Sequence, residues 1–442
     1  MFYPRHRPWK AAVALLPLWL SIVATPLSHA LPLEDFDTSI VLPPSQGTGE
    51  GVSPLQQVLD QLRRGDSHGA LARARQLNQT YPDIAATHEL LGTVLLVRGD
   101  GEAAAGAFER ALATDAGQYT ARLKLATLRR TAGDERGAAR LLRQGLHRSE
   151  DADAALYQRL GDWAVAAGDA EAAVGHYRLS LNAREALPVR VALARIYALG
   201  GFPLSARELL DGAVPPDVED PDAQLVYGVL LFASGELSRA ARHLEAAANL
   251  APESPHPPQY QGAVQRHWGR LDESRRQLER HVSLAPQSAQ GHAELGETLF
   301  LLNRDELAQA HFQRAEALGH TRAPLYKRLG DLRARQGDEV QAEAYYRRAL
   351  ALDDVDHTTA AALADLYRRQ GLADRALEVL QAFVERFPER PGGHYALGQH
   401  YRQVDRPELA LTALERSLDL APGQPTVEAE VAALRRDLTA EP

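Results

Sequence analysis

The chain has 442 residues, of which 45% are hydrophobic and 24% are charged, and its formal net charge is −9. This balance is typical of a folded protein, and the acidic excess disfavours non-specific binding to nucleic acid or to anionic lipid. The sequence contains no Cys, which excludes disulfides, thiolate metal sites and Cys nucleophiles.

Residues 1–30 have the layout of a secretory signal peptide. A basic start is followed by an apolar run over residues 11–24, and Ser28 and Ala30 are small residues three and one before a cut after Ala30. We therefore expect the protein to be exported to the periplasm. The alternative is an uncleaved N-terminal helix that anchors the protein, which the short run and Pro17 disfavour.

A period of about 34 residues runs through the rest of the chain, and it begins with a small residue in a Leu-rich context. Steps of 33 to 35 residues separate its ten occurrences, and a second small residue lies 12 positions after each one. We expect each period to hold two amphipathic helices that cross where these small residues lie. The first series is Gly92, Ala126, Gly161, Ala194, Gly228, Gly262, Gly296, Gly330, Ala364 and Gly398.

Gly followed by an acidic residue separates the two expected helices in many periods. Gly tolerates positive φ and ends the first helix, while the acid favours the positive start of the second helix. These pairs are Gly99-Asp100, Gly133-Asp134, Gly168-Asp169, Gly235-Glu236 and Gly337-Asp338. Bulky residues 16 positions after the first small residue are expected to fill space against the next unit, as with Phe108, Tyr177, Phe312 and Tyr346.

The spacing and residue types resemble the tetratricopeptide repeat family. Its 34-residue pattern has a bulky residue, Leu-Gly, Tyr, Ala, Phe, Ala and Pro in that order. One unit of this chain matches with Tyr326, Leu329-Gly330, Ala342, Tyr346 and Ala349, and another matches with Leu397-Gly398, Tyr401, Ala410 and Pro422. The resemblance implies an all-α fold, a right-handed superhelical α-solenoid of about eleven 34-residue helix–turn–helix repeats.

The same register divides the mature chain into three parts. Residues 31–50, rich in Pro and Gly, are expected to be a flexible leader. Residues 51–424 are expected to form the repeat array, and residues 425–442 a C-terminal capping helix and tail. Because the array reaches almost to the last residue of the sequence, we expect no catalytic domain behind it and no enzyme activity.

The resemblance also implies that the first helix of each repeat lines a concave groove for a peptide or a partner helix. Groove positions lie three before, one after, and four or five after the small residue. In the C-terminal half they place acids beside Arg, and we expect them to bind an extended peptide. The predicted residues are Gln259, Arg266, Glu297, Lys327, Asp331, Arg335, Asp365, Arg368, Arg369, Tyr395, Gln399 and Arg402.

Two alternatives remain open for this groove. Asp331 with Arg335, or Asp365 with Arg368 and Arg369, could be ordinary ion pairs along one helix, each worth a few tenths of a kcal/mol. The N-terminal stretch of the groove is more apolar, because its equivalent positions include Leu96, Val165, Val229 and Phe232. It could take a partner helix, or the leader of residues 31–50 could close it.

Sequence motifs for catalysis, phosphate binding or metal binding are absent. His residues are dense in the seventh and eighth units, but none stands four positions from another, so we expect ordinary surface or interface His and no metal or cofactor. These residues are His256, His267, His281, His292, His311 and His320.

The sequence as a whole predicts a non-catalytic scaffold or adaptor for protein partners in the cell envelope. We expect no nucleic acid, no small-molecule substrate and, after signal cleavage, no membrane-spanning domain. By analogy with similar exported arrays, it would serve a secretion or polysaccharide-export assembly. The alternatives are a membrane-anchored repeat adaptor and an accessory subunit of an envelope enzyme.

Overall fold

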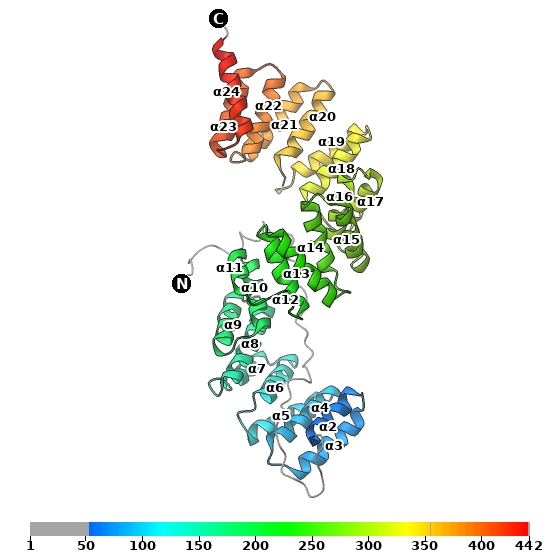
Figure 1. The fold of residues 1–442 in the computed structure, drawn as a ribbon, viewed down its shortest axis with the longest axis vertical. Helices are drawn as coiled ribbons and strands as arrows, with labels where there is room; N and C mark the ends of the chain where they lie inside the picture. The colour runs from blue at the N-terminus through cyan, green and yellow to red at the C-terminus, as the bar shows by residue number, and fades with distance from the viewer. Residues whose placement is uncertain (1–52, 354, 441–442) are drawn as a thin grey trace. The chain divides into compact units, whose positions relative to one another are not determined.

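The computed structural model describes residues 53–353 and 355–440, which form helices joined by turns (Figure 1). Twenty-three helices follow one another in these ranges, and no strand occurs among them. The predicted signal peptide and leader, residues 1–30 and 31–50, lie outside the described residues. The expectation of an all-α repeat fold is confirmed.

The chain divides into two compact units between Leu250 and Ala251. The first unit contains α2 (Pro54–Arg63), α3 (Ser67–Thr80), α4 (Ala85–Val97), α5 (Gly101–Thr114), α6 (Tyr119–Thr131), α7 (Glu135–Arg143), α8 (Glu150–Ala166), α9 (Ala170–Ala183), α10 (Leu187–Leu199), α11 (Pro203–Leu210), α12 (Pro221–Ala233) and α13 (Leu237–Leu250). The second unit contains α14 (His256–His267), α15 (Leu271–Leu284), α16 (Ala289–Leu301), α17 (Asp305–Ala317), α18 (Ala323–Arg335), α19 (Glu339–Leu350), α20 (His357–Arg369), α21 (Ala373–Arg386), α22 (Pro391–Gln403), α23 (Pro407–Leu420) and α24 (Pro425–Ala440).

Each repeat pairs an even-numbered first helix with the odd-numbered second helix that follows it. The part of the chain that the structure describes therefore holds eleven pairs and the single helix α24. The most extensive contacts join the two helices of one pair, as between α8 and α9. None of the helices in the described ranges has the length and apolar character that a membrane span requires.

The turn inside the repeats that contain a Gly-Asp pair is built as these pairs predict. Gly99 has φ of +83° and Gly168 has φ of +74°, a conformation that a residue with Cβ rarely adopts. The Asp that follows is the N-cap of the second helix, and the Asp134 carboxylate accepts a hydrogen bond from the Gly137 amide at 2.8 Å. A Gly with positive φ and a side-chain cap therefore fix where the second helix of such a repeat starts.

The two helices of a repeat make their closest approach at the small residue of the first helix. A Cβ built on Gly161 would lie 2.6 Å from the ring of Tyr177, which comes 16 positions later. Aromatic residues at this position always accompany Gly, in Gly92–Phe108, Gly161–Tyr177, Gly296–Phe312 and Gly330–Tyr346. Repeats with Ala have Leu there, in Ala126–Leu142, Ala194–Leu210 and Ala364–Leu380. We expected these rings to fill space against the next unit. The structure instead packs each ring on the Gly of its own repeat.

A His in the first helix holds the turn that precedes it. The Nε2 atom of His88 lies 2.7 Å from the carbonyl oxygen of Pro82, six positions earlier. The same contact recurs in the second unit, between His292 and Pro286 at 3.3 Å and between His394 and Pro388 at 2.9 Å. Since a carbonyl oxygen only accepts, Nε2 is the protonated nitrogen of each ring.

Each unit has its own hydrophobic core of small and branched residues from both helices of its repeats. The core of the first unit extends from Leu55 to Leu160, and a core in the second extends from Leu278 to Ala396. Leu414 of α23 packs with Val427 of α24 in a smaller cluster, which attaches the last helix to the second unit.

The pairing of Gly with an aromatic ring makes a testable prediction. Gly161→Ala should destabilise the chain by about 1–3 kcal/mol, because the added methyl group overlaps the Tyr177 ring. Combining it with Tyr177→Leu should restore part of the loss, since Ala with Leu is the native pair in three repeats. Urea unfolding followed by circular dichroism measures both effects as a double-mutant cycle.

Gly175→Ala is the matched control within the same repeat. A Cβ at Gly175 in α9 meets no atom within 4 Å, so this change should stabilise the helix by about 0.5–1 kcal/mol. Equal destabilisation by Ala at both positions would contradict the account.

Candidate functional site

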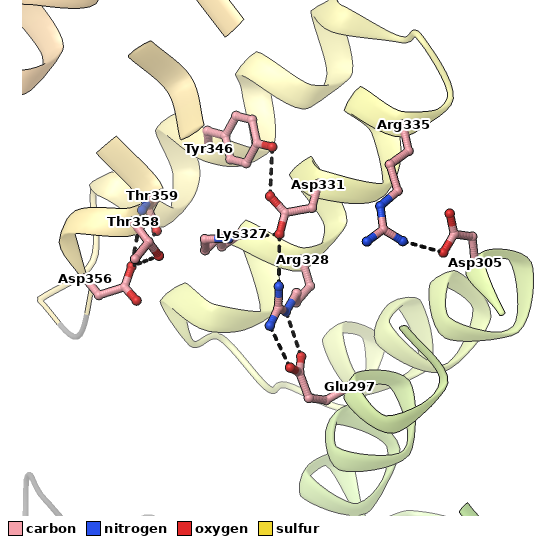
Figure 2. A network of polar contacts seen from close by, with 10 residues as sticks. All are labelled: Glu297, Asp305, Lys327, Arg328, Asp331, Arg335, Tyr346, Asp356, Thr358 and Thr359. Carbon is pink, nitrogen blue, oxygen red and sulfur yellow. Dashed lines mark hydrogen bonds and ion pairs between the residues drawn. The ribbon is translucent and has the colours of Figure 1, made fainter. Parts of the chain in front are cut away.

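The predicted site residues lie on α14, α16, α18, α20 and α22, the first helices of the second unit. We call the surface that these five helices form the first-helix face. The structure brings Glu297, Lys327 and Asp331 together in one polar network (Figure 2). It places the other predicted residues in separate contacts along the same helices.

Arg328 is the centre of this network, although the sequence analysis did not select it. Its Nε atom donates to Glu297 at 2.8 Å and an Nη atom donates to the other Glu297 oxygen at 2.7 Å, which is a bidentate pair. The second Nη atom lies 3.2 Å from Asp331, which also accepts from Lys327 at 2.9 Å. These contacts join α16 to α18.

Tyr346 of α19 supports the network from the second helix of the repeat, because its hydroxyl donates to Asp331 at 2.9 Å. Burial raises the pKa of Tyr346 above its ordinary value, and the charge of Asp331 raises it further, so the hydroxyl stays a donor. Burial lowers the pKa of Arg328, but Glu297 and Asp331 outweigh this effect and hold it above its ordinary value. The Tyr346 hydroxyl therefore stays neutral and the Arg328 guanidinium stays charged at neutral pH.

Two guanidinium groups from α18 lie close to the ring of Phe300 of α16. The Arg328 group is 4.5 Å and the Arg335 group 3.9 Å from the centre of the ring. Arg335 also donates to Asp305 of α17 at 2.8 Å, as Figure 2 shows. The pair considered between Asp331 and Arg335 is therefore wrong. Asp331 instead accepts from Lys327 and Arg328 of its own helix and from Tyr346 of α19, and Arg335 bonds Asp305 of α17.

The predicted residues of α20 form a simpler and more exposed arrangement. Arg368 donates to Asp365 at 2.6 Å, and the two side chains are 41% and 56% exposed. Arg369 donates to the backbone carbonyl of Asp365 at 3.4 Å. The alternative of an ion pair along one helix is confirmed for Asp365 and Arg368.

Gln259 of α14 is buried and donates to Glu294 of α16 at 3.2 Å. Gln290 donates to the same carboxyl oxygen at 2.6 Å. Burial raises the pKa of Glu294, while Gln290 and the charge of Arg266 counteract it. Gln259 and Arg266 therefore surround a buried carboxyl group that the sequence analysis did not select.

The predicted residues of α22 contact the last helix. Gln399 and Arg402 both reach Glu430 of α24, and the Arg402–Glu430 distance is 3.2 Å. Tyr395 packs against the apolar cluster that contains Leu414. Helix α24 thus supplies a charged partner to the first-helix face.

One register rule unites these contacts across both units. Each contact joins two successive repeats. One partner lies two positions before the small residue of its repeat, and the other lies one position after the small residue of the preceding repeat. This holds for Lys124 with Thr93, Arg328 with Glu297 and, counted from Ala432, Glu430 with Gln399. The position two before the small residue was not among the predicted groove positions. Complementary charges at equivalent positions of successive repeats are the sequence signal that marks it.

The most buried example of the rule lies in the first unit, where Lys124 donates to Thr93 at 3.2 Å and both side chains are buried. Lys124 has a second partner, Glu89, which lies three positions before the small residue Gly92 and is outside the rule. Lys124 of α6 donates to Glu89 of α4 at 2.9 Å, with side chains that are 4% and 5% exposed. Thr120 donates to the second Glu89 oxygen at 2.8 Å. Of the apolar positions expected in this stretch, Val229 is buried and Val165 is 37% exposed.

A model of the tetratricopeptide repeat family matches residues 55–119 and 361–425. The cellulose synthase operon protein C of Xanthomonas axonopodis pv. citri is 29% identical over 223 residues, which are 47% of this chain and 15% of that relative's length. A tetratricopeptide repeat protein from Parabacteroides merdae, 13% identical, superposes with a TM-score of 0.46 over 56% of this chain and 98% of its own. A chain of the APC/C hetero-tetramer Cut9-Hcn1 is 18% identical to this chain. It superposes with a TM-score of 0.45 over 86% of this chain and 83% of its own length.

The network makes a prediction about stability. Arg328→Ala should destabilise the second unit by about 1–3 kcal/mol, because it leaves Glu297 without either of its two hydrogen bonds from Arg328. Arg368→Ala should change stability by less than about 0.5 kcal/mol, since it removes an exposed pair within one helix. Urea unfolding of the full chain measures the free energy of unfolding of both variants. An equal decrease in the two variants would show that Arg328 is an ordinary surface residue.

Proposed function

We propose that this chain, which is a tetratricopeptide repeat protein, is a non-catalytic scaffold that holds an acidic, extended segment of a partner protein on the first-helix face. Repeats of this kind support protein–protein interaction as the general role. Beyond this general role, we propose which surface binds the partner and that the bound segment is acidic.

An uneven distribution of charge within the second unit carries the proposal. The first helices α14, α16, α18, α20 and α22 contain eight Lys or Arg and four Asp or Glu. The second helices α15, α17, α19, α21 and α23 contain nine Arg and fourteen Asp or Glu. The first-helix face is thus basic in a chain whose net charge is −9, and it favours an acidic partner.

The contacts on this face suggest how an acidic segment would bind. Arg328 is held rigidly by Glu297 and Asp331, so it supports the surface without being free to exchange partners. Arg368 and Arg402 are each 41% exposed and bonded by weak surface pairs. Carboxylates of a partner could replace those pairs at little cost and gain the planar Arg fork.

The cell envelope is the proposed location, and secretion or polysaccharide export the proposed process. The signal-like N-terminus of the sequence supports export. The partial likeness to a protein named for a cellulose synthase operon supports a role beside polysaccharide synthesis. Sequencing the N-terminus of the protein recovered from a periplasmic fraction tests the location, and a start after Ala30 is expected.

Charge reversal on one face tests the proposed surface. The combined Arg368→Glu and Arg402→Glu variant should lose the partner captured by the native chain from a detergent-solubilised envelope fraction. The same partner should elute as the salt concentration rises, because exposed charges are screened. Mass spectrometry of the captured material measures both effects.

Arg276→Glu with Arg416→Glu is the matched control, because it changes the net charge equally on the second helices α15 and α23. Both of these side chains are exposed, at 61% and 48%. The control should retain the partner. Loss in both variants, or in the control alone, would place the binding surface elsewhere.

A further inference from the structure

Three arginines form a basic surface along α7, a second helix of the first unit. Arg136, Arg140 and Arg143 follow one another at intervals of four and three residues, which places them on one side of the helix. All three are exposed, and none has a hydrogen bond or an ion pair with the residues that the structure describes. Together with Glu135 and Ala139, they line a hollow of about 600 Å³. We call the three arginines the α7 stripe.

Several other arginines of the first unit do have carboxylate partners. Arg129 bonds Glu109 at 2.9 Å, and Arg184 bonds Asp151 at 2.8 Å. The α7 stripe instead presents three like charges to solvent within two turns of one helix. Because these charges repel one another, a partner that carries carboxylates is favoured at this surface.

An acidic surface of the same kind lies on α21, a second helix of the second unit. Glu378, Gln381 and Glu385 are exposed and lie on one side of this helix, and we call them the α21 stripe. With Asp374, the two glutamates are all the acids of α21, and these three carboxylates have no hydrogen bond or ion pair within the described ranges. In α15, α17, α19 and α23, by contrast, at least one acid pairs with an Arg.

The two stripes have the same spacing in opposite chain directions. The α21 stripe advances by three and then four residues from Glu378, and the α7 stripe goes back by three and then four residues from Arg143. When the two helices lie antiparallel, Arg143 is therefore level with Glu378, and Arg136 is level with Glu385. In each helix the two charges are seven residues apart, which is about 10.5 Å along the axis.

Small residues occupy the same level between these charges on both helices. Ala139 lies four positions before Arg143, and Ala382 lies four positions after Glu378. Ala139 is half-buried and Ala382 is exposed, so neither side chain projects far from its helix. Two helices that meet at these positions can approach closely, and the longer charged side chains then reach across the contact.

We propose that α7 of one copy of this chain binds α21 of a second copy in antiparallel orientation, through the α7 stripe and the α21 stripe. One chain supplies both of the complementary surfaces, so no other protein is required. A single exposed pair of Arg and carboxylate contributes little, and the association therefore depends on several pairs and weakens in salt. Each copy carries both stripes, so the contact allows a closed pair of chains or a longer assembly.

Sedimentation velocity of the full chain, over a range of protein concentrations at low salt, tests the contact. The native chain should sediment faster as its concentration rises, and it should be monomeric in about 1 M NaCl, where charges are screened within about 3 Å. Arg136→Glu with Arg143→Glu should weaken this self-association at least about tenfold, because like charges then face each other. Glu378→Arg with Glu385→Arg should have the same effect for the same reason.

An equimolar mixture of these two variants is the most specific sample. The first variant has two acidic stripes and the second has two basic stripes, so each variant alone should be monomeric. In the mixture every contact joins opposite charges, and the two variants should associate with each other as tightly as the native chain does with itself. Circular dichroism of each variant confirms that it is folded.

Arg75→Glu with Arg242→Glu is the matched control, because it changes the net charge equally at exposed positions of α3 and α13. It should associate as the native chain does, and loss of association here would assign the effect to net charge and overturn the proposal. A native chain that stays monomeric at every concentration would also overturn it, and would assign the α7 stripe to an acidic segment of another protein. A mixture of two folded variants that stays monomeric would exclude the proposed register.

Discussion

The close approach of two helices at one small residue is the constraint on which the rest of this structure depends. Gly330 has no side chain where the ring of Tyr346 lies, and a Cβ there would be 2.6 Å from a ring carbon. The residue 16 positions later is Leu wherever Ala replaces Gly, as with Ala126 and Leu142, and Leu also packs on Gly in three repeats, as with Gly262 and Leu278. Packing at this crossing therefore sets the geometry of each repeat and fixes its phase along the chain.

A fixed phase explains why the polar contacts between first helices recur. Because successive repeats have nearly equal length, the residue two before one small position faces the residue one after the preceding small position. Thr93 with Lys124 and Glu297 with Arg328 are the same contact in different units. Glu430 extends it to α24, so the last helix completes the face of the final repeat as well as its core.

The parts of the fold that depend on local chemistry could be predicted from the sequence. Gly99 with Asp100 predicts a helix end and a helix start because backbone conformation and capping are decided within a few residues. The spacing of small residues predicts the helix pairs for the same reason. The signal peptide and the leader stay predictions, since they lie outside the described residues.

The site was harder to predict because its contacts join different helices. Glu297, Lys327 and Asp331 were predicted to share one surface, and the structure joins them in one polar network, but Arg328 was omitted and Arg335 was given the wrong partner. Which of several neighbouring cations reaches a carboxylate depends on side-chain direction, which spacing alone does not specify.

The division between a basic first-helix face and acidic second helices is the central claim about function. Hydrogen–deuterium exchange of the full chain, with and without a synthetic poly-Glu peptide, tests it most directly. The account predicts slower exchange in α16, α18, α20 and α22 and no change in α17, α19, α21 and α23. Protection confined to the second helices, or equal in both sets, would contradict it.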